Sequence, residues 1–162
     1  MKTLIIYISI HHGNTEKVAE AIAEVLDAKL LRPWEVNVND FSKYDLVGFG
    51  SGIYFGKHHE SLLNLIDRLP MQENRKAFIF ATSGMPNGAQ WPYGNFNRPL
   101  KKKLLQKGFD IVGKFSCRGF DTMRPWNLIG GISKGSPNEE DLRKARKFAQ
   151  ELLVKLSAVY GI

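Results

Sequence analysis

The sequence has one cysteine, Cys117, and no long apolar run. A lone cysteine excludes an internal disulfide, and such a residue ordinarily serves as a small apolar side chain in a strand. No apolar stretch approaches the ~20 residues that cross a bilayer, and no cleavage site of small residues follows the apolar N-terminal run. We therefore expect a cytoplasmic protein with no transmembrane segment.

Two common phosphate-binding motifs and any metal-ligand cluster are also missing. Without G-x-x-x-x-G-K-[ST], a nucleoside triphosphate would find neither the lysine nor the magnesium-binding hydroxyl that its hydrolysis uses. Without G-x-G-x-x-G, the dinucleotide fingerprint is not met. No set of His, Cys, Asp or Glu residues has the spacing of a metal site, so we expect no bound metal.

The chain is basic, with a formal net charge of +7 over 162 residues. Much of it comes from Lys101–Lys103 and from the basic residues between 143 and 147. Such runs are usually solvated helix faces, although they also attract acidic proteins or anionic small molecules. No nucleic-acid motif accompanies them, so we do not expect a nucleic-acid partner. The length and the 43% hydrophobic content predict a single domain over residues 1–162.

An anion-binding turn is predicted at residues 9–15. An apolar run at 4–8 precedes it, and an amphipathic helical pattern from about 15 to 27 follows. In a strand–turn–helix unit, the loop amides and the helix N-terminus point at one spot and favour an anion there. Gly13 lets the backbone approach a ligand closely. The turn has no Lys or Arg, so its polar groups are amides, short side chains and two imidazoles, from Ser9, His11, His12, Gly13, Asn14 and Thr15.

Five strand patterns alternate with four helical patterns along the rest of the chain. Unbroken apolar runs are typical of parallel strands that are covered on both faces, and right-handed crossovers between them give a layered α/β sheet. The last helix is expected to start with Ser136 as its cap and Pro137 in its first turn. The predicted strands are 2–8, short pieces within 28–40, 44–50, 76–82 and 110–117, and the helices are about 15–27, 58–69, 98–107 and 137–157.

Three loops should meet beyond the carboxyl ends of the strands, where such sheets bind ligands. They are residues 9–15, 51–58 and 83–97. The first is the anion-binding turn, and the other two carry glycines and aromatic residues. This combination suits a ligand with a phosphate at one end and a flat group at the other. A second long connection, residues 118–135, has no assigned role.

Three segments of the chain resemble the flavodoxin family. Residues 9–15 are similar to the family's FMN phosphate loop, except for His11 and His12, where small residues are usual. Residues 44–54 are similar to the strand and loop beneath the flavin ring, and Phe80–Gly84 to the start of the third flavin loop. The resemblance covers nearly the whole chain. It implies an α/β three-layer sandwich with a five-stranded parallel sheet in the order 2-1-3-4-5, and FMN as the cofactor.

The resemblance also implies a set of cofactor-binding residues. The phosphate would be held by Ser9, His11, Gly13, Asn14 and Thr15. The ring and its edge would meet Ser51, Gly52, Ile53, Tyr54, Phe55 and Gly56, then Thr82, Ser83 and Gly84, with Tyr54, Trp91 or Tyr93 stacking on the ring. His58 and His59, next to the second loop, are expected at an exposed helix start.

The function that the resemblance implies is electron transfer by bound FMN, with a redox partner protein or a small electron donor or acceptor. The basic charge of the chain favours a partner of acidic or anionic character. Residues 53–58 are also similar to flavodoxin-like protoporphyrinogen dehydrogenases, which pass electrons to quinone. The alternative is thus an FMN-dependent oxidoreductase acting on a porphyrinogen, a quinone or NAD(P)H. A module that binds another phosphate compound is a third hypothesis. Electron-carrier flavodoxins are typically strongly acidic, which this chain is not.

Overall fold

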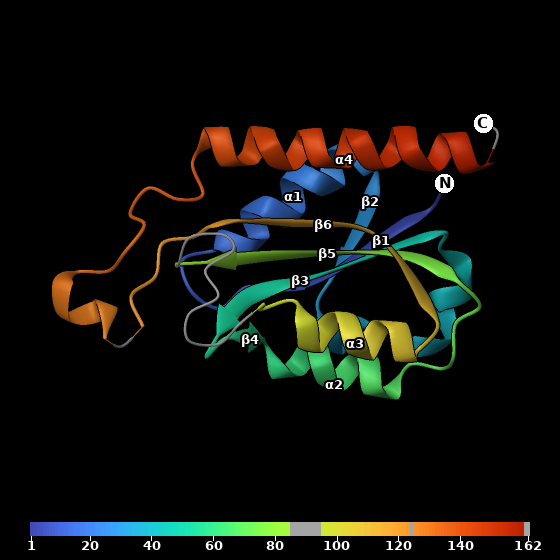
Figure 1. Cartoon of the computed structure of the whole chain (residues 1–162), viewed down its shortest axis with the longest axis horizontal. Coiled ribbons are helices and arrows are strands. Elements are labelled where there is room, and N and C mark those ends of the chain that lie inside the picture. Colours follow the sequence, from blue (N-terminus) through green and yellow to red (C-terminus); the bar gives the residue numbers. More distant parts are fainter. Residues whose placement is uncertain (85–94, 124, 161–162) are drawn as a thin grey trace.

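The computed structural model describes residues 1–84, 95–123 and 125–160. Its α-helices alternate with the strands of a single sheet (Figure 1). The strands are β1 (Thr3–Ile8), β2 (Ala28–Leu31), β3 (Leu46–Tyr54), β4 (Lys57–His58), β5 (Arg75–Ser83) and β6 (Phe109–Arg118). The helices are α1 (Asn14–Leu26), α2 (Glu60–Arg68), α3 (Arg98–Gln106) and α4 (Glu139–Tyr160), with short 3-10 helices η1 (Pro33–Glu35), η2 (Val38–Lys43) and η3 (Trp126–Ile129).

The sheet confirms the predicted topology. Its parallel strands lie in the order β2-β1-β3-β5-β6, which is 2-1-3-4-5 when only the parallel strands are counted. The short β4 is an addition that pairs antiparallel with the end of β3. Helices α1 and α4 cover one face of the sheet, and α2 and α3 cover the other (Figure 1). Each face has its own apolar core, so the buried strands are apolar on both sides, as parallel strands require.

Strand β3 extends beyond its predicted end at residue 50, because Ser51 and Gly52, predicted as the start of a loop, continue the pairing with β5. Gly48 and Gly50 lie opposite Phe78 and Phe80 of β5. A Cβ on Gly48 would come within 2.3 Å of the Phe78 ring, and one on Gly50 within 2.2 Å of the Phe80 ring. Only a residue without a side chain lets these two rings lie across β3, which explains the glycine at both positions.

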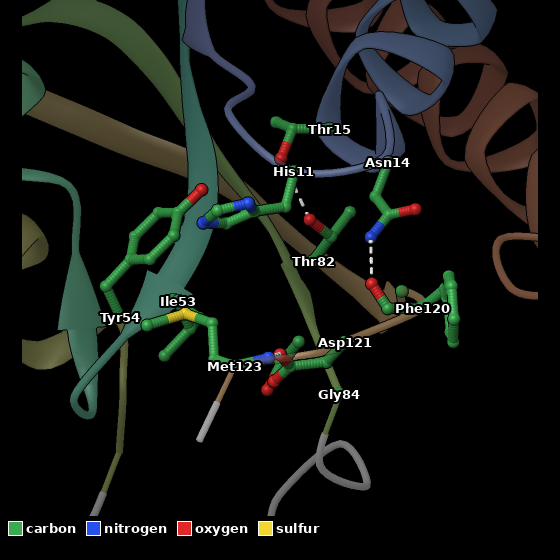
Figure 2. Close-up of a pocket in the computed structure, with 13 residues that line it drawn as sticks. His11, Asn14, Thr15, Ile53, Tyr54, Thr82, Gly84, Phe120, Asp121 and Met123 are labelled. Atoms are coloured by element: carbon green, nitrogen blue, oxygen red, sulfur yellow. Dashed lines mark hydrogen bonds between the residues drawn. The ribbon is translucent and has the colours of Figure 1, made fainter. Parts of the chain in front are cut away.

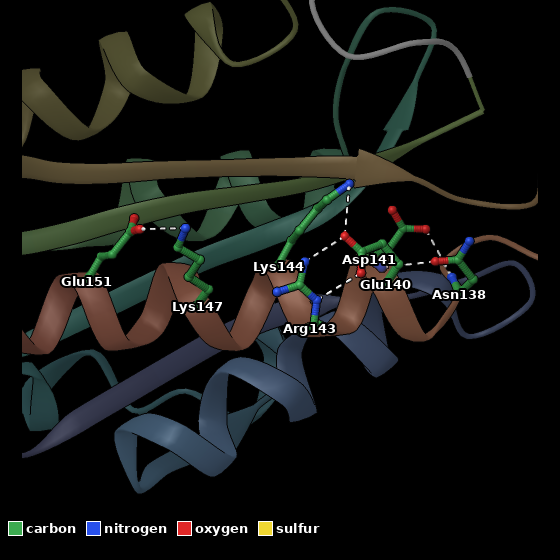
Figure 3. A network of polar contacts seen from close by, with 7 residues as sticks. All are labelled: Asn138, Glu140, Asp141, Arg143, Lys144, Lys147 and Glu151. Carbon is green, nitrogen blue, oxygen red and sulfur yellow. Dashed lines mark hydrogen bonds and ion pairs between the residues drawn. The ribbon is translucent and has the colours of Figure 1, made fainter.

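Helix α4 begins two residues later than predicted (Figure 3). The cap is Asn138 and not Ser136: the Asp141 amide donates to Asn138 Oδ1, and the Asn138 amide donates to Asp141 Oδ2, both at 3.0 Å. This reciprocal pair satisfies two amides at the helix start. The basic residues that follow are paired with Glu140, Glu24, Glu139 and Glu151, so the run at 143–147 is a solvated helix face whose charge is largely matched locally.

The carboxyl ends of β1, β3 and β5 all lie at one edge of the sheet, on the left in Figure 1. The segment between β6 and α4, residues 119–138, extends along the same edge and carries η3. It is held by an isolated antiparallel bridge between Asp121 and Ile132. In the part of the chain that the structure describes, no helix is both long and apolar enough to cross a membrane.

Candidate functional site

A cavity open to solvent lies at this carboxyl edge, and the empty space there, open solvent included, is about 340 Å³ (Figure 2). It is walled by the three loops that the sequence pointed to and by a fourth segment that it did not. The lining residues are His11, Asn14, Thr15, Gly52, Ile53, Tyr54, Thr82, Ser83, Gly84, Gly119, Phe120, Asp121 and Met123. Nine of these thirteen are predicted cofactor-binding residues, so the fold does bring distant parts of the predicted site together.

The turn from β1 into α1 forms one end of the cavity. His12 and Gly13 both have left-handed backbones, with φ of 56° and 66°. Gly13 occupies the N-cap position of α1 and has no side chain, so it forms no side-chain hydrogen bond with the first amides of the helix. Ser9 Oγ is buried and has no hydrogen-bond partner in the described residues. A buried hydroxyl without a partner beside a helix N-terminus is a donor that suits a phosphate oxygen.

Asn14 and Thr15 face the cavity, but each is already held by another segment (Figure 2). Thr15 Oγ1 and Thr82 Oγ1 are 2.8 Å apart, which ties the turn to the end of β5. Asn14 Nδ2 donates to the carbonyl of Phe120 at 2.8 Å. These contacts join residues separated by 67 and 106 positions, so the turn is fixed before any ligand binds.

A further contact fixes the orientation of helix α1. The Tyr7 hydroxyl donates to Glu16 Oε1 at 2.8 Å, and Arg32 Nη2 donates to the same oxygen at 2.6 Å. Burial raises the pKa of Tyr7 to about 12, so the phenol stays protonated and keeps donating. The bond from Tyr7 lowers the pKa of Glu16, which stays ionised. The first turn of α1 is thereby bound to β1 and to the end of β2.

The wall from β3 differs from the prediction in its details. Gly52, Ile53 and Tyr54 line the cavity, whereas Ser51 is fully buried and turns its side chain away from it. Ser51 Oγ lies 2.7 Å from the Gly52 carbonyl and 2.9 Å from His58 Nδ1. Phe55 is 79% exposed at the tight turn into β4, and neither it nor Gly56 lines this cavity. Ser51 therefore positions the neighbouring peptide, while its side chain makes no wall of its own.

His58 is buried, and the expectation of an exposed position for it is wrong. Its side chain is 1% exposed, between Ser51 and Asn97, whose Oδ1 lies 2.8 Å from His58 Nε2. Burial lowers the pKa of His58 to about 4, although the bond to Asn97 opposes the shift. The imidazole is neutral at pH 7. His59 caps α2 by accepting from the Ser61 amide, so it does mark a helix start.

A second groove, with about 730 Å³ of open space, lies beside the cavity. His11 and Tyr54 line both, so they form the boundary between them. The ring centroids of His11 and Tyr54 are 6.2 Å apart, and the Tyr54 ring meets His59 edge-on at 5.4 Å. Burial raises the pKa of Tyr54, so its hydroxyl stays protonated at neutral pH. The groove is completed by Ile10, Phe55, Lys57, His58, His59 and Glu60.

The fourth wall of the cavity, residues 119–123, is the part that sequence reasoning missed. Gly119, Phe120, Asp121 and Met123 all line the cavity. Asp121 contributes a carboxylate, of which Oδ1 accepts from the Met123 amide at 2.8 Å. The only signal in the sequence was the unusual length of the connection after β6, which carries no motif that assigns these residues to the site.

The remaining predicted positions divide into two groups. Ser9 and Gly13 belong to the turn between β1 and α1 but are not among the residues that line the cavity. Trp91 and Tyr93, predicted to stack on a ring, lie outside the described residues. Cys117 is buried in β6, where burial raises the pKa of its thiol to about 12. In the described ranges, no group of three or more His, Cys, Asp or Glu residues is arranged to hold a metal.

Comparisons with known proteins agree with this geometry. A family model described as a flavodoxin domain matches residues 4–118. An uncharacterized protein of Methanocaldococcus jannaschii is 46% identical over 153 residues, covering 94% of this chain and 99% of that protein. The match to the family model ends at β6, so residues 119–123 of the site lie beyond it.

Solved structures share the fold at low sequence identity. Oxidised Flavodoxin 2 from Bacillus cereus has a TM-score of 0.67 and 20% identity, over 96% of this chain and 99% of that one. General stress protein 14 of Treponema denticola, solved in complex with FMN, has a TM-score of 0.61 and 15% identity, over 98% and 99%. With the family model matching most of the chain and the predicted sheet order in place, this protein belongs to the flavodoxin family.

Proposed function

We propose that this protein binds FMN in the cavity at the carboxyl edge and transfers electrons through it. The observation that carries the proposal is Ser9 Oγ, a buried hydroxyl without a partner in the turn that borders the cavity, although Ser9 itself is not among the lining residues. Native proteins rarely leave such a group unpaired, because burying it without a hydrogen bond is costly. A terminal phosphate at the turn would supply the missing acceptor. The complex of a structural neighbour with FMN supports the same choice of ligand.

The residues present fit the parts of FMN. The turn at 9–15 offers amides, hydroxyls and the imidazole of His11 to the phosphate. Gly52, Ile53 and Tyr54 offer backbone groups and one aromatic face to the ring, and Gly84 also lines the cavity. When bound, FMN supplies one- and two-electron redox chemistry, while the protein sets its potential and its access. Ser51 Oγ, which is buried, lies in contact with both the Gly52 carbonyl and the His58 ring.

Equilibrium binding and reduction test this proposal. The purified protein should take up FMN more tightly than riboflavin, and anaerobic reduction of the loaded protein should be followed at the flavin absorbance. A protein that ignores both flavins but binds another phosphate compound would favour the simple binding module. A loaded protein that exchanges electrons with protein partners, and turns over no small substrate without them, would fit the carrier role.

The second groove favours one alternative, an FMN-dependent oxidoreductase that acts on a small organic molecule. The groove shares His11 and Tyr54 with the cavity, so a molecule in it would lie one side chain away from bound FMN. Its lining combines apolar and aromatic side chains with imidazoles, which suits a flat molecule such as a quinone or a porphyrinogen. Steady-state turnover of such a molecule, or of NAD(P)H, without a protein partner would favour this alternative.

The charge of the chain bears on its partner. The net charge of +7 favours an acidic protein or an anionic small molecule as electron donor or acceptor. Near the site, Lys57, Arg118 and Lys134 are exposed. Lys57 has Glu60 at 3.5 Å as a weak partner. A cytoplasmic location and a single-domain organisation stay predictions from the sequence.

A further inference from the structure

The phosphate-binding turn has a backbone that most residues avoid. His12 has φ of 56°, and Gly13 follows it with φ of 66°. Glycine adopts such values freely, whereas a residue with a side chain does so only when its surroundings hold it there. His12 is therefore the strained position of the turn, and it is one of the two residues at which the chain departs from the small side chains usual in this loop.

Two contacts hold His12 and a third holds Asn14, and all three come from one distant segment. His12 Nε2 lies 2.9 Å from Thr122 Oγ1, across 110 residues of sequence. The His12 ring lies over Phe120, with 4.5 Å between the ring centroids. Next to it, Asn14 Nδ2 donates to the Phe120 carbonyl at 2.8 Å (Figure 2). Residues 120 and 122 thus hold both sides of Gly13.

The same segment is fastened at its other end. Ser133 Oγ donates to the Gly84 carbonyl at 2.9 Å, beside the end of β5. The antiparallel bridge between Asp121 and Ile132 joins the beginning of this segment to its later part. The backbone bridge fixes residues 120–122 independently of the Ser133 side chain, so these residues are able to impose a conformation on the turn that they touch.

We infer that Thr122 and Phe120, through His12, are positioning residues that hold the turn at 9–15 in its phosphate-binding shape. The inference rests on the proposed function, because it assigns the role relative to the phosphate of FMN. Thr122 does not line the cavity, so it acts through His12 and not by touching the ligand. Phe120 and Thr122 lie beyond the residues that match the family model, whereas His12 lies within them.

The test compares FMN with riboflavin, which differs from it only by the phosphate. Thr122→Val keeps the shape of the side chain and removes the hydroxyl, whereas Thr122→Ser keeps the hydroxyl. Thr122→Val should raise the Kd of FMN about three- to tenfold, which is the net value of one hydrogen bond, and should leave the Kd of riboflavin nearly unchanged. Thr122→Ser should bind both flavins like the unaltered protein.

Ser133→Ala is the matched control, because it loosens the same segment at the end away from the turn. It should leave the ratio of the Kd of riboflavin to the Kd of FMN unchanged. The inference is overturned if Thr122→Val keeps the ratio of the unaltered protein. It is also overturned if Ser133→Ala lowers the ratio as much as Thr122→Val does. If the unaltered protein prefers FMN and Thr122→Val shows the same preference, the inference is wrong while the proposed function stands. An unaltered protein that binds neither flavin would sink the proposed function and the inference with it.

Discussion

The His58 Nε2 atom lies 2.8 Å from Asn97 Oδ1, and this contact joins the β3–β4 hairpin to the residue that precedes α3. The other nitrogen of the same ring, Nδ1, lies 2.9 Å from Ser51 Oγ. Ser51 Oγ also accepts a hydrogen bond from the His59 amide. A neutral imidazole can donate from one nitrogen and accept at the other, so it serves both neighbours at once. One buried ring thereby connects two of the loops that border the site.

Because the pKa of His58 is about 4 in the folded chain and about 6.5 in the unfolded chain, stability should depend on pH. Between these values the unfolded state binds the proton and the folded state does not, so the free energy of unfolding falls as the pH falls. The stabilisation is complete above pH 6.5 and is lost toward pH 4. From pH 7 to pH 5 the loss should be about 2 kcal/mol, measured by urea unfolding.

His58→Gln tests the origin of this dependence, since an amide can also serve two hydrogen-bond partners but does not titrate. The variant should be less stable at pH 7. Its free energy of unfolding should fall much less between pH 7 and pH 5 than that of the unaltered protein. A variant with the same pH dependence as the unaltered protein would assign the effect to other groups, such as the half-buried His59.

Ser9→Ala should separate binding from stability. Ser9 Oγ is buried without a partner, so its removal should leave the free energy of unfolding unchanged or slightly increased. The same change removes a donor to a charged phosphate, which should weaken FMN by roughly ten- to a hundredfold and riboflavin far less. Calorimetric titration and thermal unfolding of the two proteins measure both effects. A destabilised variant with normal FMN affinity would contradict the assignment.

Gly50→Ala should destabilise the sheet, because the new Cβ would lie 2.2 Å from the Phe80 ring. Overpacking of this kind costs about 1–3 kcal/mol. The double variant Gly50→Ala with Phe80→Leu should recover part of the loss, since the shortened side chain frees the space over β3. Urea unfolding of the two single variants and the double variant gives the coupling between the two positions. Strictly additive losses would show that the two residues do not compete for this space.

These cases show what the sequence could and could not predict. Apolar runs and a helix start are local patterns, so the parallel sheet and the turn at 9–15 were predictable. Gly50 was correctly predicted as part of a strand, but the reason for its being a glycine, an aromatic ring on another strand, was not predictable. His58 is buried by a partner 39 residues away, and Phe120 meets Asn14 across 106 residues. No local pattern contains such pairings.

Salt should reveal the sign of the charge around the site. After reduction of the FMN-loaded protein, its oxidation by ferricyanide should slow as ionic strength rises from about 10 mM to 150 mM, because the Debye length shortens from ~30 Å to ~8 Å. Benzoquinone, which is uncharged, is the control and should react at a rate that hardly changes. Stopped-flow absorbance at several salt concentrations measures both. A ferricyanide rate that increases with salt would mean that the surface at the exit of electrons is acidic, despite the net charge of +7.

Asp121→Asn should raise the reduction potential of the bound flavin. The Asp121 carboxylate belongs to the cavity wall, and a negative charge there opposes the addition of electrons to a ligand in the cavity. The amide keeps an oxygen for the bond from the Met123 amide, so the backbone of the wall should stay in place. The expected rise is about 40 mV, which corresponds to ~1 kcal/mol for one electron, and equilibration with a dye of known potential measures it. An unchanged potential together with unchanged FMN affinity would place the carboxylate too far from the redox centre to act on it, and Asp121 would then have only its structural bond to Met123.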